Sequence, residues 1–251
     1  MRNKKEFDSV IELKEEGKNN SEISRITKIP RGTVKDWINN PPKHFTGNIS
    51  KSSLKDEVIN NKELHPIYSY LLGLYLGDGY INKCERTFRM RIALDKKYIK
   101  LNKYAVDNMK KLFIENKVGI VNYENYINIS VYNSQIPNLF PQHGKGVKHS
   151  RDVSLKKWQK DISISEELIK GLIHSDGCFY KETIKNKYIY ERYVFSNKSE
   201  DLHEIFQNLC EELDIDFDFQ NKGDGSWNTR IAKKESVEKL KNIIGTKEMP
   251  L

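Results

Sequence analysis

The chain has 251 residues and a formal net charge of +8, from 43 lysines and arginines against 35 aspartates and glutamates. This length allows one large domain or two to three small ones, and the modest positive charge favours anionic partners without by itself indicating nucleic acid. Three scattered cysteines without a CxxC pair argue against structural zinc, and the absence of a signal peptide or membrane-spanning stretch predicts a cytoplasmic protein.

Residues 1–40 are predicted to form three short helices. The first runs from Lys4 to Glu16 with an apolar stripe, the second is capped by Ser21, and the third runs from Arg31 to Ile38. Two short helices joined by a tight turn are typical of a helix-turn-helix DNA-binding domain, and a small helical bundle for protein contacts is the alternative. Three side chains of the third helix would face a major groove: Arg31, Thr33 and Lys35.

Residues 41–64 are polar and are predicted to form a linker, with one helical turn near Leu54 to Ile59. Beyond it the chain contains the same motif twice. The first copy is Leu-Leu-Gly-Leu-Tyr-Leu-Gly-Asp-Gly at 71–79, and the second is Ile-Lys-Gly-Leu-Ile-His-Ser-Asp-Gly at 169–177. Two such copies are improbable by chance, so we expect an internal duplication with repeats at 65–160 and 161–251.

The element order after each motif supports this duplication. In the first repeat we expect strands at 80–83 and 88–94, a helix at 96–116, and strands at 119–123 and 126–132. In the second we expect strands at 179–184 and 188–196, a helix at 199–213, strands at 216–220 and 229–232, and a helix at 236–244. The prediction is an α+β fold in which the order αββαββα occurs twice.

The motif glycines have two expected roles. Gly73 and Gly171 would let the two motif helices pack with their backbones close together. Gly79 and Gly177 would take the left-handed conformation that often ends a helix.

The motif aspartates, Asp78 and Asp176, would stand at the negative ends of their helix dipoles and repel each other where the helices pair. A bound divalent cation removes both problems, so they are candidate metal ligands. The alternative is that each Asp-Gly pair merely ends its helix.

By these two motifs, the region from His65 to Leu251 resembles the LAGLIDADG family of homing endonucleases in its single-chain, two-motif arrangement. The resemblance implies a monomer with saddle-shaped antiparallel sheets and internal pseudo-two-fold symmetry. It also implies site-specific hydrolysis of double-stranded DNA that depends on Mg²⁺ or another divalent cation such as Mn²⁺, with one motif aspartate for each strand.

The same resemblance assigns roles to further residues. Metal ligands would come from Asp78 and Asp176 and from the residues before them, Gly77 and Ser175. The family uses a lysine near each centre, for which Lys148, with Lys145 as second choice, and Lys247 are the candidates. Asp95 and Asn197 occupy the place of a polar residue that orders solvent, although Asp95 departs from the usual amide.

Recognition of DNA would come from the sheets. Alternation on the strand at 88–94 turns two arginines away from the core, and the other strands carry similar outward rows. The candidate contacts are Arg89, Arg91, Asn128, Ser130, Lys145, Tyr190, Arg192 and Arg230.

Two functions from different classes fit this sequence. One is an active endonuclease, and the other is a transcription regulator that binds DNA through a helix-turn-helix and a LAGLIDADG scaffold without cleaving it. Retention of both motif acids favours the nuclease, whereas the N-terminal helices favour the regulator. A protein-interaction module would explain neither the basic charge nor the paired acids.

Overall fold

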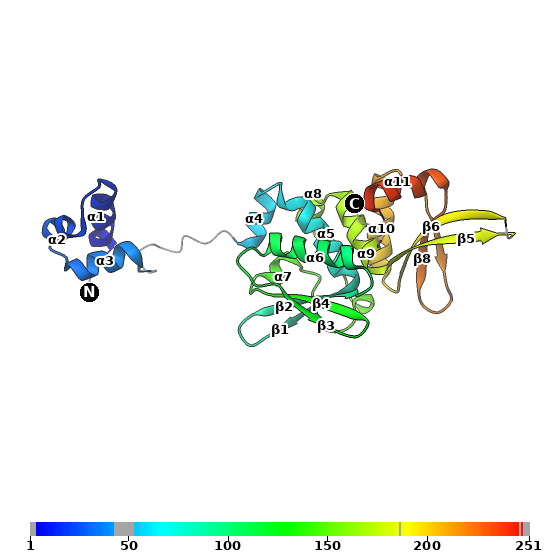
Figure 1. The fold of residues 1–251 in the computed structure, drawn as a ribbon, viewed down its shortest axis with the longest axis horizontal. Coiled ribbons are helices and arrows are strands. Elements are labelled where there is room, and N and C mark those ends of the chain that lie inside the picture. Colours follow the sequence, from blue (N-terminus) through cyan, green and yellow to red (C-terminus); the bar gives the residue numbers. More distant parts are fainter. Residues whose placement is uncertain (1–3, 43–52, 186, 246, 248–251) are drawn as a thin grey trace. The chain divides into compact units, whose positions relative to one another are not determined.

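The computed structural model describes residues 4–42, 53–185, 187–245 and 247. The chain divides into two compact units, Met1–Ser53 and Leu54–Leu251 (Figure 1). Over the described ranges, no helix combines the length and the hydropathy that a membrane crossing requires. Part of the expected linker lies outside the described residues, and its last part forms helix α4 (Leu54–Asn60).

The first unit contains three helices: α1 (Lys4–Glu15), α2 (Asn20–Thr27) and α3 (Arg31–Asn39). They enclose a small core of Phe7, Val10, Ile23, Ile29, Val34 and Trp37. The predicted helices are therefore present. Lys28 has a left-handed backbone (φ 56°) that ends α2, and the buried Ile29 fixes the turn into α3.

The expected cap of the second helix was wrong. Asn19, not Ser21, is the N-cap, and its side-chain oxygen accepts from the backbone N–H groups of Ser21 and Glu22 at 3.0 and 3.1 Å. The Glu22 carboxylate accepts from the Asn19 N–H at 2.8 Å, which completes a capping box. The helix therefore begins before Ser21, because the box satisfies the N–H groups of its first turn.

The second unit contains two repeats joined by a connecting segment. The first repeat comprises α4, α5 (Leu64–Asp78), β1 (Gly79–Lys83), β2 (Phe88–Asp95), α6 (Ile99–Leu112), β3 (Gly119–Asn122), β4 (Tyr126–Tyr132) and α7 (Ile136–Leu139). The connecting segment includes a 3₁₀ turn at Lys148–Ser150 and α8 (Lys157–Ile162). The second repeat comprises α9 (Ser165–Asp176), β5 (Gly177–Ile184), β6 (Tyr188–Asn197), α10 (Glu200–Glu212), β7 (Asp218–Asn221), β8 (Trp227–Ile231) and α11 (Lys234–Ile244).

Each repeat builds one four-stranded antiparallel sheet. Sheet 1 has the order β1-β2-β4-β3, and sheet 2 has the equivalent order β5-β6-β8-β7. The predicted duplicated α+β architecture is therefore confirmed. Sheet 2 differs in its first hairpin: β8 pairs only with residues 193–197 of β6, so the rest of β5 and β6 projects as a two-stranded arm (Figure 1).

One core holds both repeats together. Helix α5 is apolar around most of its circumference and is buried from Tyr68 to Leu76, which is typical of a helix at the centre of a domain. It packs along α9, and the two helices lie side by side in the middle of the unit (Figure 1). Gly73 lies against Gly171 and Gly77 lies against Ser175, so the C-terminal ends of the two helices come together.

One expected helix is shorter in the structure, and the closing helices of the two repeats differ in length. Helix α6 spans Ile99–Leu112 instead of 96–116, because the chain first makes a turn after Asp95. The closing helix of the first repeat has only four residues, Ile136–Leu139, whereas its counterpart α11 has eleven. The first repeat therefore ends in an extended connecting segment where the second ends in a helix.

Candidate active site

The two motif helices approach closely enough that only glycine fits at their contact. A Cβ built on Gly73 would lie 2.5 Å from the Leu168 carbonyl oxygen and 2.8 Å from the Gly171 Cα. A Cβ built on Gly171 would in turn lie 2.9 Å from the Gly73 Cα. Real side chains do not reach such distances, so the spacing between α5 and α9 depends on these two residues.

Gly79 and Gly177 have another role than expected. Their φ values are −86° and −88°, in the extended region, so the prediction of a left-handed conformation was wrong. In each repeat the chain passes directly from the motif helix into the first strand, and the first strand residue lies against the last helical turn. A Cβ on Gly177 would meet the Ile173 Cα at 2.6 Å, and a Cβ on Gly79 would overlap Tyr75. Close packing, not backbone strain, requires these glycines.

The paired helix ends bring Asp78 and Asp176 together. A Cβ on Gly77 would overlap the Ser175 side chain and would lie 2.8 Å from the Asp176 Oδ2, so the absence of a side chain at Gly77 leaves room for that carboxylate. Asp78 is accessible to solvent, yet it is closely surrounded by protein atoms. Loss of hydration and the neighbouring charge of Asp176 raise the pKa of Asp78 from 3.8 to about 6. Burial also raises the pKa of Asp176.

Two lysines contact these helix ends. The Lys148 ammonium donates to three carbonyl oxygens at the end of α5, those of Tyr75 (2.5 Å), Leu76 (3.0 Å) and Gly77 (2.6 Å). Lys247 donates to the carbonyl oxygen of Ser175 at the end of α9 at 2.9 Å. Each ammonium thus satisfies free carbonyl groups and opposes the negative end of a helix dipole.

Each of the two lysines is also attracted by the aspartates at the ends of both motif helices. Burial lowers the pKa of Lys148 to about 8, against the attraction of Asp176 and Asp78. Burial likewise lowers the pKa of Lys247, and its strongest attraction is to Asp78. Each lysine therefore binds the end of one motif helix and is attracted most strongly by the carboxylate of the other.

The surroundings of the two aspartates are not equivalent. Asn197 donates from its side-chain amide to the Asp176 Oδ2 at 2.8 Å. In the register of the sheets, Gly177 pairs with Phe195 and Gly79 pairs with Ile92, so Leu94 is the counterpart of Asn197. The prediction that Asp95 is equivalent to Asn197 was therefore wrong by one residue.

Asp95 lies at the exposed end of its strand. Its Oδ1 accepts from the Lys97 N–H at 3.0 Å, and its Oδ2 lies 3.1 Å from the Lys97 ammonium. These hydrogen bonds lower the pKa of Asp95. Among the residues that the structure describes, no side chain donates a hydrogen bond to the Asp78 carboxylate as Asn197 does to Asp176.

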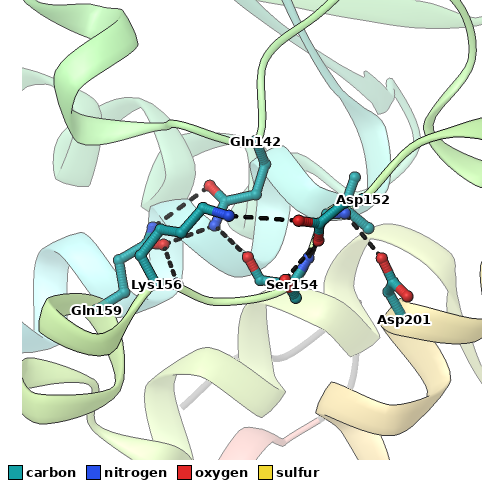
Figure 2. A network of polar contacts seen from close by, with 7 residues as sticks. Gln142, Asp152, Ser154, Lys156, Gln159 and Asp201 are labelled. Carbon is teal, nitrogen blue, oxygen red and sulfur yellow. Dashed lines mark hydrogen bonds and ion pairs between the residues drawn. The ribbon is translucent and has the colours of Figure 1, made fainter.

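The connecting segment that carries Lys148 is anchored in the first repeat by buried amides. Gln142 Nε2 donates to the Gln159 Oε1 at 2.6 Å and to the Ser154 carbonyl at 3.1 Å (Figure 2). Gln159 Nε2 in turn donates to the Tyr68 hydroxyl at 2.7 Å. Gln142 and Gln159 are almost completely buried. Gln159 therefore binds the segment to α5 through Tyr68, and Gln142 joins the two ends of the segment through Gln159.

The same segment is also bound to the second repeat. The Asp201 carboxylate on α10 accepts from the Val153 N–H at 2.8 Å (Figure 2). Arg151 donates to the carbonyl oxygens of residues 144–146 and holds the turn before Lys148 in place. Sequence patterns assign no role to Arg151, because these acceptors are backbone groups that no residue pattern identifies.

The open face of sheet 1 is the face turned away from the core. Arg91 lies between Tyr80 on β1 and Ser130 on β4, and Arg89 lies between Asn82 and Tyr132. Both guanidinium groups lie 5.4 Å from a tyrosine ring centre. Asn128 shares this face, whereas Ser130 is only 4% exposed beneath Arg89, which donates to it at 3.3 Å.

The open face of sheet 2 carries Tyr190 and Arg192 on β6 and Arg230 on β8. The buried residues Tyr193 and Ile231 point to the opposite, core face, which agrees with the alternation. Lys145 is exposed on the connecting segment. In the first unit, Arg31 and Lys35 are exposed on α3, and Thr33 is half-buried.

Within the described residues, no group of three or more histidine, cysteine, aspartate or glutamate side chains could hold a metal ion. The carbonyl groups of Gly77 and Ser175 accept from Lys148 and Lys247. A cation at the paired helix ends would therefore have Asp78 and Asp176 as its protein carboxylate ligands and would need further oxygens from elsewhere.

Residues 163–245 match the family model of the LAGLIDADG-like domain. The second repeat is a LAGLIDADG-like domain. This domain runs from the start of α9 to the end of α11, and the first repeat has the same sheet topology. No curated protein matches the chain in sequence.

Solved structures of a two-repeat protein have the same fold. A structure of the homing endonuclease I-DmoI in complex with DNA and Ca is 20% identical, covers 75% of this chain and 94% of its own, and has a TM-score of 0.52. A structure of mesophilic variants of I-DmoI is 19% identical, covers 72% of this chain and 96% of its own, and has a TM-score of 0.51. The LAGLIDADG-like domain and its partner repeat thus form one duplicated fold.

Proposed function

We propose that this protein is a site-specific endonuclease that hydrolyses double-stranded DNA, with Asp78 and Asp176 each serving one strand. The observation that carries the proposal is the convergence of these two carboxylates at the ends of tightly packed helices. Two carboxylates held together with raised pKa values are unfavourable for folding, and such groups are typical of functional sites.

The proposed cofactor is Mg²⁺, or another divalent cation such as Mn²⁺. Mg²⁺ prefers oxygen ligands and retains waters, so two protein carboxylates together with phosphate oxygens form a suitable set. Gly77 and Ser175 are the less favoured ligands of the proposed set, because a cation at their carbonyls would compete with the lysine ammoniums. When bound, the cation would polarise the phosphate and lower the pKa of a bound water.

The protein's own groups would act around that chemistry. Lys148 and Lys247 would hold the helix ends in position and offset the negative charge of the scissile phosphates. Asn197 would fix the orientation of the Asp176 carboxylate through its hydrogen bond. The residues of the open sheet faces, with Lys145, would contact the duplex.

The proposed partner is double-stranded DNA bound by a monomer, since both repeats lie in one chain. In support, the I-DmoI structures with this fold include complexes with DNA and Mn and with DNA and Ca. The proposed role of the first unit is that of a helix-turn-helix domain, with Arg31, Thr33 and Lys35 at the DNA. Its exposed basic positions at the start of α3 are typical of a recognition helix.

A second function is supported by that first unit. A three-helix unit with a basic α3 is not needed for strand cleavage, and it favours a regulator that binds DNA without cutting it. The two functions differ in one measurable property, because the regulator requires the sheets and α3 but not the carboxylates.

The deciding experiment incubates the full chain with Mg²⁺ and a pool of duplexes that includes DNA flanking its own gene. Double-strand cutting by the wild type, lost in both Asp78→Asn and Asp176→Asn, supports the nuclease. Asp161→Asn is the matched control, because this aspartate is exposed on α8. Tight, sequence-selective binding by the wild type without any cut would contradict cleavage and support the regulator.

A further inference from the structure

The open faces of the two sheets differ in charge, although both would meet DNA. On sheet 1, the strand residues of the open face include Arg89 and Arg91, and the one acid of this alternation, Asp95, ends the strand and pairs with Lys97. The two arginines contact tyrosine rings and Ser130. In the described part of the chain, neither has a carboxylate within ion-pair distance.

The arginines of sheet 2 are each paired with an acid on the same face. Arg192 Nε lies 3.4 Å from the Glu182 carboxylate, and an Arg230 guanidinium nitrogen lies 3.4 Å from the Asp218 carboxylate. The strand register brings each acid to its arginine: Glu182 is opposite Tyr190, next to Arg192 on the same face, and Asp218 is directly opposite Arg230. The open face of sheet 2 therefore carries two positive and two negative strand charges.

This difference has opposite consequences for phosphate and for bases. An arginine without an acid can neutralise a phosphate and release a counterion, which makes binding strong and dependent on salt. An arginine beside a carboxylate gains less from a phosphate, because the acid repels it. The same carboxylate can hold the guanidinium in a fixed orientation toward guanine, or can accept from the amino group of cytosine.

We propose that the sheets divide these tasks: sheet 1 provides most of the sequence-independent affinity, whereas Glu182 and Asp218 are specificity-determining residues that restrain Arg192 and Arg230. The proposal rests on DNA binding by this fold, as proposed above. It requires no cleavage and therefore applies to the nuclease and to the regulator.

The test measures the affinity of the full chain for a random-sequence duplex over a series of salt concentrations, without divalent cations. For Arg89→Gln with Arg91→Gln, the slope of log affinity against log salt should fall by about 2, since each phosphate contact contributes about 0.9. For Arg192→Gln with Arg230→Gln the slope should fall by less than about 1. Lys103→Gln with Lys110→Gln removes two exposed charges from α6 and should leave the slope unchanged.

The decisive variant is Glu182→Gln with Asp218→Asn. It should bind random duplex about tenfold more tightly than the wild type and show a steeper salt dependence, because two arginines become available to phosphates. Equal slope losses for the two arginine pairs, or no change in the Glu182 and Asp218 variant, would overturn the division of tasks. A wild type that binds no duplex at low salt would instead overturn the proposed function itself. Thermal melts of each variant verify that these surface changes leave the fold intact.

Discussion

The end of α5 and the end of α9 are built on the same helix pair but have different surroundings. The α5 end has three carbonyl groups bound by Lys148, and Leu94 occupies the position in sheet 1 that is equivalent to Asn197. The α9 end has one carbonyl bound by Lys247, and Asn197 donates to its aspartate. The backbones of the two helices are in direct contact and tolerate little change, whereas the side chains around the two carboxylates differ between the ends.

The largest effect is expected where the two ends are most alike. Gly73→Ala and Gly171→Ala should each reduce the free energy of unfolding by about 2 to 3 kcal/mol, despite the higher helix propensity of alanine, because the new Cβ overlaps the facing backbone. Denaturant unfolding measures this. Gly144→Ala, whose Cβ would meet Arg151 at 3.4 Å, is the control and should change stability by less than about 0.5 kcal/mol. A large difference between the first two variants would show that the helix pair itself is asymmetric.

The lysines should separate the two ends in activity. Lys148→Met removes three hydrogen bonds and the positive charge that Asp176 attracts most strongly, and should lower the cleavage rate roughly 100-fold. Lys247→Met removes one hydrogen bond and should lower the rate roughly tenfold. Single-turnover kinetics on a cleaved duplex measure both, with Lys145→Met as an exposed control. Equal losses would mean that the number of carbonyl contacts is irrelevant.

Asn197→Leu would give the α9 end the residue type found at Leu94. The Asp176 carboxylate would lose its amide donor, and we expect roughly a tenfold loss in cutting of one strand, in keeping with one hydrogen bond to a charged group. Separate labels on the two strands report which one slows. Slowing of both strands to the same extent would contradict a local role for Asn197.

The smallest effect concerns stability and pH. The pKa of Asp78 in the folded protein, about 6, lies above its ordinary value of 3.8, so the folded state holds a proton that the unfolded state has lost between these values. Stability should therefore fall as pH rises through this window. Without divalent cations, Asp78→Asn should raise stability at about pH 8 by at most about 1 kcal/mol, a figure discounted for solvent exposure.

The matching measurements sharpen this prediction. The gain from Asp78→Asn should vanish below about pH 4, where the carboxylate is protonated in both states. Asp176→Asn should give a smaller gain, because burial raises the pKa of Asp176 but the charge of Lys148 and the Asn197 hydrogen bond oppose this rise. A gain from Asp78→Asn that does not depend on pH would show that charge is not its cause. Thermal melts of the wild type and of the two variants at several pH values measure these gains.

Several features of the site could be predicted from local patterns. Helical and strand periodicity, with the repeated motif, predicted the duplicated fold, the pairing of the motif helices and the outward position of Arg89 and Arg91. The outward position of the arginines depends on residues a few positions apart in the chain, and the other two features depend on the recurrence of a short motif. The expected left-handed glycines were wrong, because a helix that ends in Asp-Gly can also pass directly into a strand.

The sequence alone determined the duplication, the alternation of the strands and the presence of an aspartate at the end of each motif helix, because the last two follow from residues close together in the chain and the duplication follows from the recurrence of one short motif. Only the tertiary structure decided what stands beside those aspartates and beside the arginines of the open faces. Leu94 rather than Asp95 is the counterpart of Asn197, and Glu182 and Asp218 lie beside arginines, because hairpin length and strand register set these neighbours. A shift of one residue in register exchanges the two faces of a strand, so local patterns cannot fix such contacts.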